Sequence, residues 1–151
     1  MTKTWGPHIW NFLHCFCEKI NEDFFINNKN MIFVFLNNIL FNLPCPICSN
    51  DSRIQFGKVN INIIKTKEDL KNLIFYYHNY VNKKLKKNVK GINILNVYKN
   101  YNIHKCYNNF RLVYFKKYNF KLNIYSRMLI NKDKEQNYVK NWWYKYRKNF
   151  N

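Results

Sequence analysis

The residue pair with the clearest capacity for chemistry is Cys45 and Cys48, two thiols at CxxC spacing. Thiols at this spacing can close to a disulfide and reopen by exchange with other thiols. Pro44 and Pro46 flank Cys45, and proline is well tolerated in the first turn of a helix. We therefore expect Cys45 at a helix N-cap and Cys48 one turn inside that helix. There the unpaired backbone N–H groups and the positive end of the helix dipole favour the reactive thiolate.

A CxxC pair alone is compatible with three kinds of site. A thioredoxin-like redox motif needs a strand before the pair, whereas helical patterns precede and follow it here. A zinc site needs further ligands, which Cys15, Cys17, His14 and His78 could supply, although they fall within expected helices. The third possibility is a dithiol beside a flat redox cofactor, for which Trp10 and the two histidines would be suitable neighbours.

The segments that must position this pair are predicted to be helices. The chain opens with a helical pattern for which Thr4 is a candidate N-cap, and Trp10 and His14 lie four residues apart on one of its faces. The apolar segment 31–41 is predicted as a buried helix because a Leu-Pro break and a new helix follow it. That new helix carries Cys48 and is expected to end before Gly57.

The longest predicted helix follows a capping box at residues 66–69. An apolar stripe at helical spacing continues over residues 70–85. His78 and Asn82 share one face of this helix. Lysines close it, where cations suit the negative end of the dipole, and Gly91 is expected to mark its stop.

The remainder of the chain carries weaker signals. Residues 92–101 are predicted as a short further helix, 110–130 show a mixed pattern with some alternation, and 134–148 form a basic, aromatic helix. We expect a main domain over residues 1–101 and a basic aromatic C-terminal extension over residues 102–151.

The amino-acid composition excludes fewer classes of function than the motifs do. The 151 residues carry 26 basic and 8 acidic side chains, a formal net charge of +18, which would suit nucleic acid or an anionic membrane. Because Lys, Asn, Ile, Phe and Tyr are all abundant, AT-rich coding explains this charge without selection for binding. The stripe Tyr138, Trp142 and Trp143 is accordingly expected to pack rather than to stack on bases.

Targeting signals and the other cysteines give further expectations. We find no secretory signal and no apolar run long enough to span a bilayer, so a soluble, intracellular protein is expected. In such a compartment cysteines serve catalysis or metal binding more often than structural disulfides. Cys15 and Cys17 are expected to be small buried hydrophobic residues, and Cys106 a free thiol.

Three motifs occur in order along the chain with helix-sized gaps between them: Trp5-Gly6-Pro7-x-x-Trp10-x-x-x-His14, Pro44-Cys45-Pro46-Ile47-Cys48 and His78-Asn79-x-Val81-Asn82-x-x-Leu85-x-Lys87. Together they resemble the Erv/ALR family of FAD-linked sulfhydryl oxidases, and the Leu-Pro-Cys-Pro-x-Cys sequence is most similar to the members from poxviruses and other large DNA viruses. The resemblance covers about residues 4–100.

The resemblance implies an all-α fold, a four-helix bundle plus a short fifth helix, that binds FAD non-covalently, usually as a homodimer. Cys45 would meet the substrate dithiol, and Cys48 would contact the isoalloxazine ring; no metal is implied. The positions that match the family's FAD-binding residues are Gly6, Trp10, His14, His78, Asn79, Asn82, Lys84 and Lys87.

The implied function is a thiol oxidase that passes electrons from thiols through FAD to O2, giving hydrogen peroxide. Its partner would be a thiol-bearing protein or a small thioredoxin-like relay protein, because the sequence has no second CxxC. We expect a viral enzyme that acts in the host cytoplasm on virion assembly. The alternative is a zinc-stabilised, basic nucleic-acid-binding module without enzymatic activity.

Two positions depart from the family pattern. Lys86 stands where family members commonly have glycine, so the local loop is expected to differ. Tyr98 is the aromatic residue nearest to the position of a tryptophan in many members.

Overall fold

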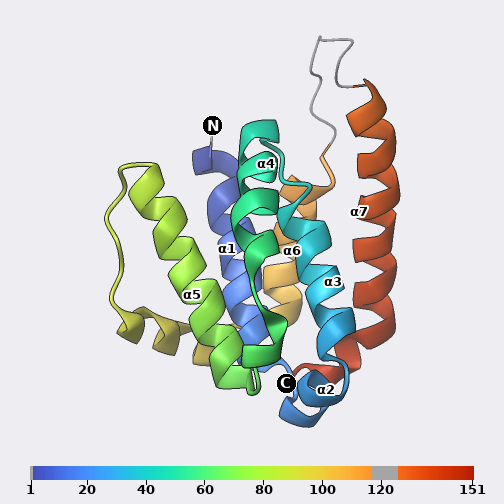
Figure 1. Ribbon diagram of the computed structural model, residues 1–151. Helices are drawn as coiled ribbons and strands as arrows, with labels where there is room; N and C mark the ends of the chain where they lie inside the picture. The colour runs from blue at the N-terminus through green and yellow to red at the C-terminus, as the bar shows by residue number, and fades with distance from the viewer. Residues whose placement is uncertain (1, 117–125) are drawn as a thin grey trace.

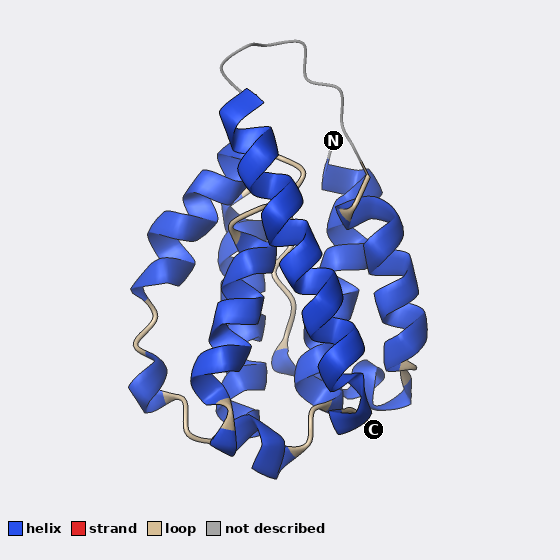
Figure 2. Cartoon of the chain, turned by 90° about the vertical axis from the view of Figure 1, so that its right-hand side faces the viewer, coloured by secondary structure: helices blue, strands red, loops and turns tan. Residues whose placement is uncertain are grey.

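The computed structural model describes residues 2–116 and 126–151, and within these ranges the chain is helical with no β-sheet (Figure 2). The predicted all-α class is therefore confirmed, whereas the count of four helices and a short fifth stays a prediction. The α-helices are α1 (Thr2–Lys19), α2 (Glu22–Asn27), α3 (Lys29–Leu40), α4 (Pro46–Gln55), α5 (Lys67–Lys84), α6 (Ile103–Tyr114) and α7 (Ser126–Tyr146). The 3-10 segments are η1 (Phe56–Lys58), η2 (Ile61–Ile63), η3 (Ile92–Asn100) and η5 (Arg147–Asn149).

Local sequence signals set the starts of α4 and α5. Cys45 is the N-cap of α4, with Pro46 as its first residue, as predicted. At α5, the Thr66 side chain accepts from the backbone N–H of Asp69, and the Asp69 carboxylate accepts from the N–H of Thr66, which completes the capping box. The prediction of Thr4 as a cap is wrong, because α1 already begins at Thr2 and continues through Pro7.

The end of α5 differs from the prediction that Gly91 marks its stop. The helix ends at Lys84, and the N–H groups of Lys86 and Lys87 turn back to the carbonyls of Lys83 and Asn82. These two hydrogen bonds form a Schellman motif, in which the residue that follows the C-cap adopts a left-handed backbone conformation. Lys86 adopts it with a φ of 55°, so the chain makes with lysine the turn for which glycine is better suited.

Helix α1 lies at the centre of the packing. It contacts α5, α6 and η3, while α3 contacts α4 and α7. Figure 1 shows α5 and α7 at opposite edges of the molecule, with α1, α3, α4 and α6 between them. This arrangement brings α1, α4 and α5, which carry the predicted site motifs, to the same side.

The C-terminal helices pack on the helices that precede them through aromatic side chains. Phe12 of α1 stacks on Phe110 of α6 with ring centroids 4.5 Å apart, and Phe35 of α3 stacks on Trp142 of α7 at 4.0 Å. Trp142 and Trp143 are 4% and 1% exposed, which confirms that they pack and excludes them as base-stacking platforms in this fold. The division into residues 1–101 and 102–151 stays a prediction, although buried side chains of both ranges belong to one hydrophobic cluster.

The mixed pattern expected over residues 110–130 is wrong where the structure describes it. Phe110 to Tyr114 completes α6, and residues 126–130 belong to α7, while residues 117–125 lie outside the described residues. The helix predicted over residues 134–148 is confirmed as part of α7 up to Tyr146, and its last two residues belong to η5.

The end of the chain returns to the end of α1. The N–H of Asn21 donates to the carbonyl of Asn149 at 2.8 Å, and the N–H of Asn151 donates to the carbonyl of Lys19 at 2.9 Å. No helix within residues 2–116 and 126–151 combines the length and hydropathy that crossing a bilayer requires.

Candidate active site

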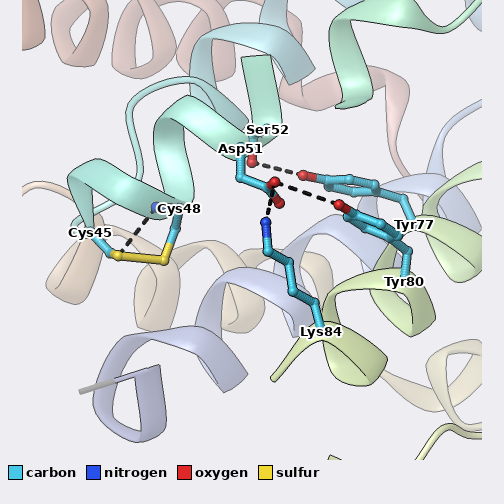
Figure 3. A network of polar contacts seen from close by, with 7 residues as sticks. All are labelled: Cys45, Cys48, Asp51, Ser52, Tyr77, Tyr80 and Lys84. Carbon is cyan, nitrogen blue, oxygen red and sulfur yellow. Dashed lines mark hydrogen bonds and ion pairs between the residues drawn. A yellow bond between two sulfur atoms is a disulfide. The ribbon is translucent and has the colours of Figure 1, made fainter. Parts of the chain in front are cut away.

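The cysteine pair forms a disulfide at the N-terminus of α4 (Figure 3). The Cys45 Sγ accepts a hydrogen bond from the Cys48 N–H at 3.3 Å, so the cap and the disulfide involve the same side chain. Both cysteines are partly exposed, and Ile47 between them is 81% exposed. An incoming thiol can therefore approach the disulfide, and a thiolate released in the first turn of α4 is stabilised by the helix dipole.

A cavity of about 340 Å³ lies beside Cys48, between α1, α4 and α5. Its walls are mostly apolar, with a few polar and cationic side chains. The lining residues are Trp5, Gly6, Pro7, Ile9, Trp10, Asn11, Leu40, Leu43, Ile47, Cys48, Asp51, Ser52, Tyr77, His78, Val81, Asn82, Lys84, Leu85 and Lys87.

Most of the residues predicted for the site lie in this one cavity, although they come from distant parts of the chain. Those in the lining are Gly6, Trp10, Cys48, His78, Asn82, Lys84 and Lys87. Cys45, His14 and Asn79 are not among the lining residues. Of the two disulfide cysteines, Cys48 therefore lines the cavity and Cys45 does not, while the contact of Cys45 with substrate stays a prediction.

His14 lies behind the cavity wall and supports His78. Its Nε2 is 2.9 Å from Nδ1 of His78, which requires one of these nitrogens to carry the hydrogen and the other to accept it. The imidazole of His78 also stacks on the indole of Trp10, with centroids 4.0 Å apart and planes 7° apart. The two predicted motifs on α1 and α5 therefore meet in one stack of rings.

Both histidines are held neutral. Burial lowers the pKa of His14 to about 4. Burial, with smaller contributions from His14 and Lys87, lowers the pKa of His78 to about 3. A neutral pair keeps the hydrogen bond between them, since protonation of both rings would leave two donors facing each other.

Tyr98 and Asn79 have clear structural contacts. Tyr98 stacks on His14 at a centroid distance of 4.9 Å and is not one of the residues that line the cavity. The Asn79 side chain donates to the carbonyl of Lys90 at 2.8 Å and accepts from its N–H at 3.0 Å. Asn79 therefore fixes the loop that follows α5 to the helix itself.

A polar network missed by the sequence analysis joins α4 to α5 next to the disulfide (Figure 3). The Tyr77 hydroxyl donates to the Ser52 hydroxyl at 2.8 Å, and burial raises the pKa of Tyr77 to about 12. Lys84 forms an ion pair with Asp51, and this hydrogen bond raises the pKa of Lys84. Asp51 and Ser52 follow Cys48 by three and four residues in the sequence. This helical spacing could have predicted that both side chains lie on the same face of the helix as Cys48.

The chemistry of the lining fits FAD. Trp10 and Tyr77 offer aromatic surface for a flat ring system, and Asn82 offers an amide for its polar edge. Lys84, which is paired with Asp51, and Lys87 are the cationic side chains of the lining, and cations suit a diphosphate. Cys48 places one sulfur of the disulfide in the same wall.

The residues needed for the zinc alternative do not converge. Cys45 and Cys48 at the start of α4 are bonded to each other, and Cys15 and Cys17 are buried side chains of α1. Among the described residues there is no group of three or more His, Cys, Asp or Glu side chains placed to hold one metal ion.

An all-helical fold with a CxxC disulfide at the wall of an aromatic, partly cationic cavity defines a class of thiol–disulfide proteins built to hold a flat cofactor beside the sulfurs. The model of the Erv1 / Alr family matches residues 7–102, and the chain belongs to this family. The resemblance inferred from the three motifs is thereby confirmed.

Curated viral proteins are similar to about half of the chain. Two FAD-linked sulfhydryl oxidases, from two isolates of African swine fever virus, are each 28% identical over 85 residues, which is 56% of this chain and 71% of theirs. A protein of Invertebrate iridescent virus 3 is 26% identical over 86 residues, 56% of this chain and 58% of its own length. No solved structure matches the chain.

Proposed function

We propose that the protein is an FAD-dependent thiol oxidase that makes disulfides with the Cys45–Cys48 pair. The observation that carries this proposal is the position of Cys48 in the wall of a cavity whose residues fit FAD, with Cys45 outside that wall. Family membership and the printed names of the viral relatives support it.

The chain's own residues perform a thiol–disulfide exchange. A substrate thiolate attacks Sγ of Cys45, which forms a mixed disulfide and releases Cys48 as a thiolate. A second thiolate of the substrate then attacks the substrate sulfur of the mixed disulfide and releases Cys45 as a thiolate. The substrate leaves as a disulfide, and Cys45 and Cys48 retain the two electrons.

The cavity determines where those electrons go. FAD, when bound there, supplies a two-electron acceptor that is reoxidised by O2 to give hydrogen peroxide. Cys48, the cysteine of the pair that lines the cavity, would be the sulfur next to bound FAD, and its position in the first turn of α4 favours the thiolate. Tyr77 and Ser52 hold α4 to α5, and Asp51 orients Lys84 at the cavity.

The other predicted FAD contacts remain part of this proposal. Gly6, Trp10, His78, Asn82, Lys84 and Lys87 would contact FAD directly. His14 would act by holding His78, and Asn79 by fixing the loop after α5.

We propose that the substrates are protein dithiols or a small thioredoxin-like relay protein, which meet the exposed side of the disulfide. We further propose that the protein acts in the cytoplasm of infected cells during virion assembly and that it forms a homodimer; the viral origin of its relatives supports the first part of this proposal.

Purification with a flavin and metal assay tests this proposal. The wild-type protein should be yellow, with one FAD per chain and no zinc. Trp10→Ala should lose FAD because it removes a ring from the cavity wall, whereas Ile54→Ala, at a 47% exposed position of α4 outside the lining, should retain it. A colourless wild-type protein that neither contains nor takes up FAD would refute the proposal.

A further inference from the structure

Ser49 of α4, the residue directly after Cys48, fixes the segment that leads into the disulfide. Its hydroxyl donates to the backbone carbonyl of Leu43 at 3.0 Å, and its backbone N–H donates to the carbonyl of Cys45 at 2.9 Å. Ser49 and Leu43 are 5% and 9% exposed, so the bond from the hydroxyl lies in the interior of the protein. One residue therefore binds the carbonyl groups on both sides of Pro44.

The two prolines limit how this segment can hold its backbone. Pro44 and Pro46 have no N–H to donate. The N–H of Cys48 donates to Sγ of Cys45 at 3.3 Å, but sulfur is a weak acceptor. The hydroxyl of Ser49 therefore supplies the strong side-chain hydrogen bond between the segment before Cys45 and the helix.

We propose that Ser49 is a positioning residue for thiol–disulfide exchange, which keeps Cys45 beside Cys48 while the disulfide is open. The inference rests on the proposed function, in which this pair opens and closes in each cycle. In the oxidised protein the disulfide itself joins the two residues. In the reduced protein that covalent link is gone, and the two hydrogen bonds of Ser49 hold the segment against the first turn of α4.

Loss of the Ser49 hydroxyl affects the two redox states unequally. In the oxidised protein the disulfide keeps the carbonyl of Leu43 in the interior, where it would lack this partner, and an unpaired buried carbonyl is costly. In the reduced protein the segment is free to turn the carbonyl toward water, which relieves the cost. Ser49→Ala therefore favours the dithiol, and the reduction potential of the pair should rise.

Redox titration of the full chain in glutathione buffers without oxygen measures this effect. Oxidised glutathione takes two electrons and two protons from the thiols of Cys45 and Cys48, which leaves the protein disulfide and two glutathione thiols. After acid quenching and alkylation, mass spectrometry of the tryptic peptide that contains both cysteines gives the ratio of dithiol to disulfide. The other three cysteines lie outside this peptide and do not contribute to the signal.

Ser49→Ala should lower the equilibrium constant for disulfide formation by about three- to tenfold, which raises the reduction potential by about 15–30 mV. Asn50→Ala, at the exposed neighbouring position, should keep the wild-type potential. Ser52→Ala also removes a buried hydroxyl from α4, but that hydroxyl bonds to Tyr77, so the potential should again stay unchanged. A wild-type potential in Ser49→Ala, or an equal rise in Ser52→Ala, would overturn the proposal.

Amide hydrogen exchange tests the same claim in the wild type, and so remains decisive if Ser49→Ala folds poorly. In the reduced wild type, the N–H of Ser49 should keep the protection that it has in the oxidised protein, because its bond to the carbonyl of Cys45 persists. Exchange at the rate of an unprotected amide would contradict the proposal.

Neither measurement depends on electron transfer to FAD or oxygen. A failure of the Ser49 prediction therefore leaves the proposed oxidase function intact. Absence of bound flavin or of oxygen uptake would refute that function and leave the redox titration of the cysteine pair intact.

Discussion

The buried pair of His14 and His78 makes a quantitative prediction about acid stability. Folded-state pKa values of about 4 and about 3 lie below the ordinary histidine value of 6.5. Below pH 6.5 the unfolded chain therefore binds more protons than the folded chain at these two sites. The contribution of the two neutral histidines to the free energy of unfolding is therefore fully present above pH 6.5. It is lost as the pH falls toward their folded-state pKa values.

The size of the effect follows from the same values. Between pH 7.5 and pH 5 the unfolded state gains nearly a full proton at each histidine, while the folded state remains neutral. Each histidine then costs about 2 kcal/mol, and the pair about 4 kcal/mol, of the free energy of unfolding. Such a loss is a large fraction of the stability of an ordinary domain.

Urea unfolding followed by circular dichroism on FAD-free protein measures this loss. The free energy of unfolding should fall by about 4 kcal/mol from pH 7.5 to pH 5, and His14→Gln should reduce the fall to about half. Ile54→Ala, at an exposed position of α4 and without a titratable side chain, is the control and should leave the pH dependence unchanged. A wild-type stability that stays constant over this range, or a His14→Gln variant that falls as steeply as wild type, would refute the buried neutral pair.

Three further substitutions test other parts of the structure. Lys86→Gly should raise the free energy of unfolding by about 1 kcal/mol, because glycine adopts the left-handed turn without the cost that a Cβ imposes; an unchanged urea midpoint would contradict this. Tyr77→Phe should lower the free energy by about 1 kcal/mol through loss of the bond to Ser52, and an equal effect in the Ser52→Ala background would show that this bond is not the cause. Trp142→Ala should destabilise the chain by about 3–5 kcal/mol in a single unfolding transition, since Trp142 packs on Phe35 in the shared core; a separate early transition would show that α7 unfolds independently.

Short-range signals in the sequence were sufficient for the elements that carry the disulfide. The Pro46 signal placed Cys45 at the N-cap, and the capping box at residues 66–69 placed the start of α5. Both signals involve a few neighbouring residues whose backbone geometry is set locally. The start of α1 was placed too late because threonine is a favoured N-cap residue, whereas Thr4 lies inside a helix that already begins at Thr2.

Long-range contacts were not available from the sequence. His14 was assigned to the FAD site from its place in the first family motif, and its hydrogen bond to His78, 64 positions away, could not be read from the sequence. Asn79 was grouped with His78 because the two residues are adjacent in one motif, yet the Asn79 side chain hydrogen-bonds to the backbone of Lys90. Side-chain direction at these positions depends on which helices pack together, and helical spacing alone does not determine that packing.

Helix α6 illustrates a signal that was present and misinterpreted. Apolar side chains at positions 103, 106, 107, 110 and 114 repeat with the helical period, and all of them are buried. The alternation of Leu112 with Tyr114 suggested a mixed segment, but Leu112 is 65% exposed and takes no part in the core. A count of matches to the helical period over the whole segment would have favoured the helix.

Dithiol-dependent oxygen uptake is the most direct test of the central claim, that Cys48 passes electrons from thiols to FAD in the adjoining cavity. With dithiothreitol, the FAD-loaded wild type should consume oxygen and release hydrogen peroxide. Cys48→Ser should retain its FAD and consume none, while Ile54→Ala should match the wild type. Oxygen uptake by Cys48→Ser at the wild-type rate would contradict the account.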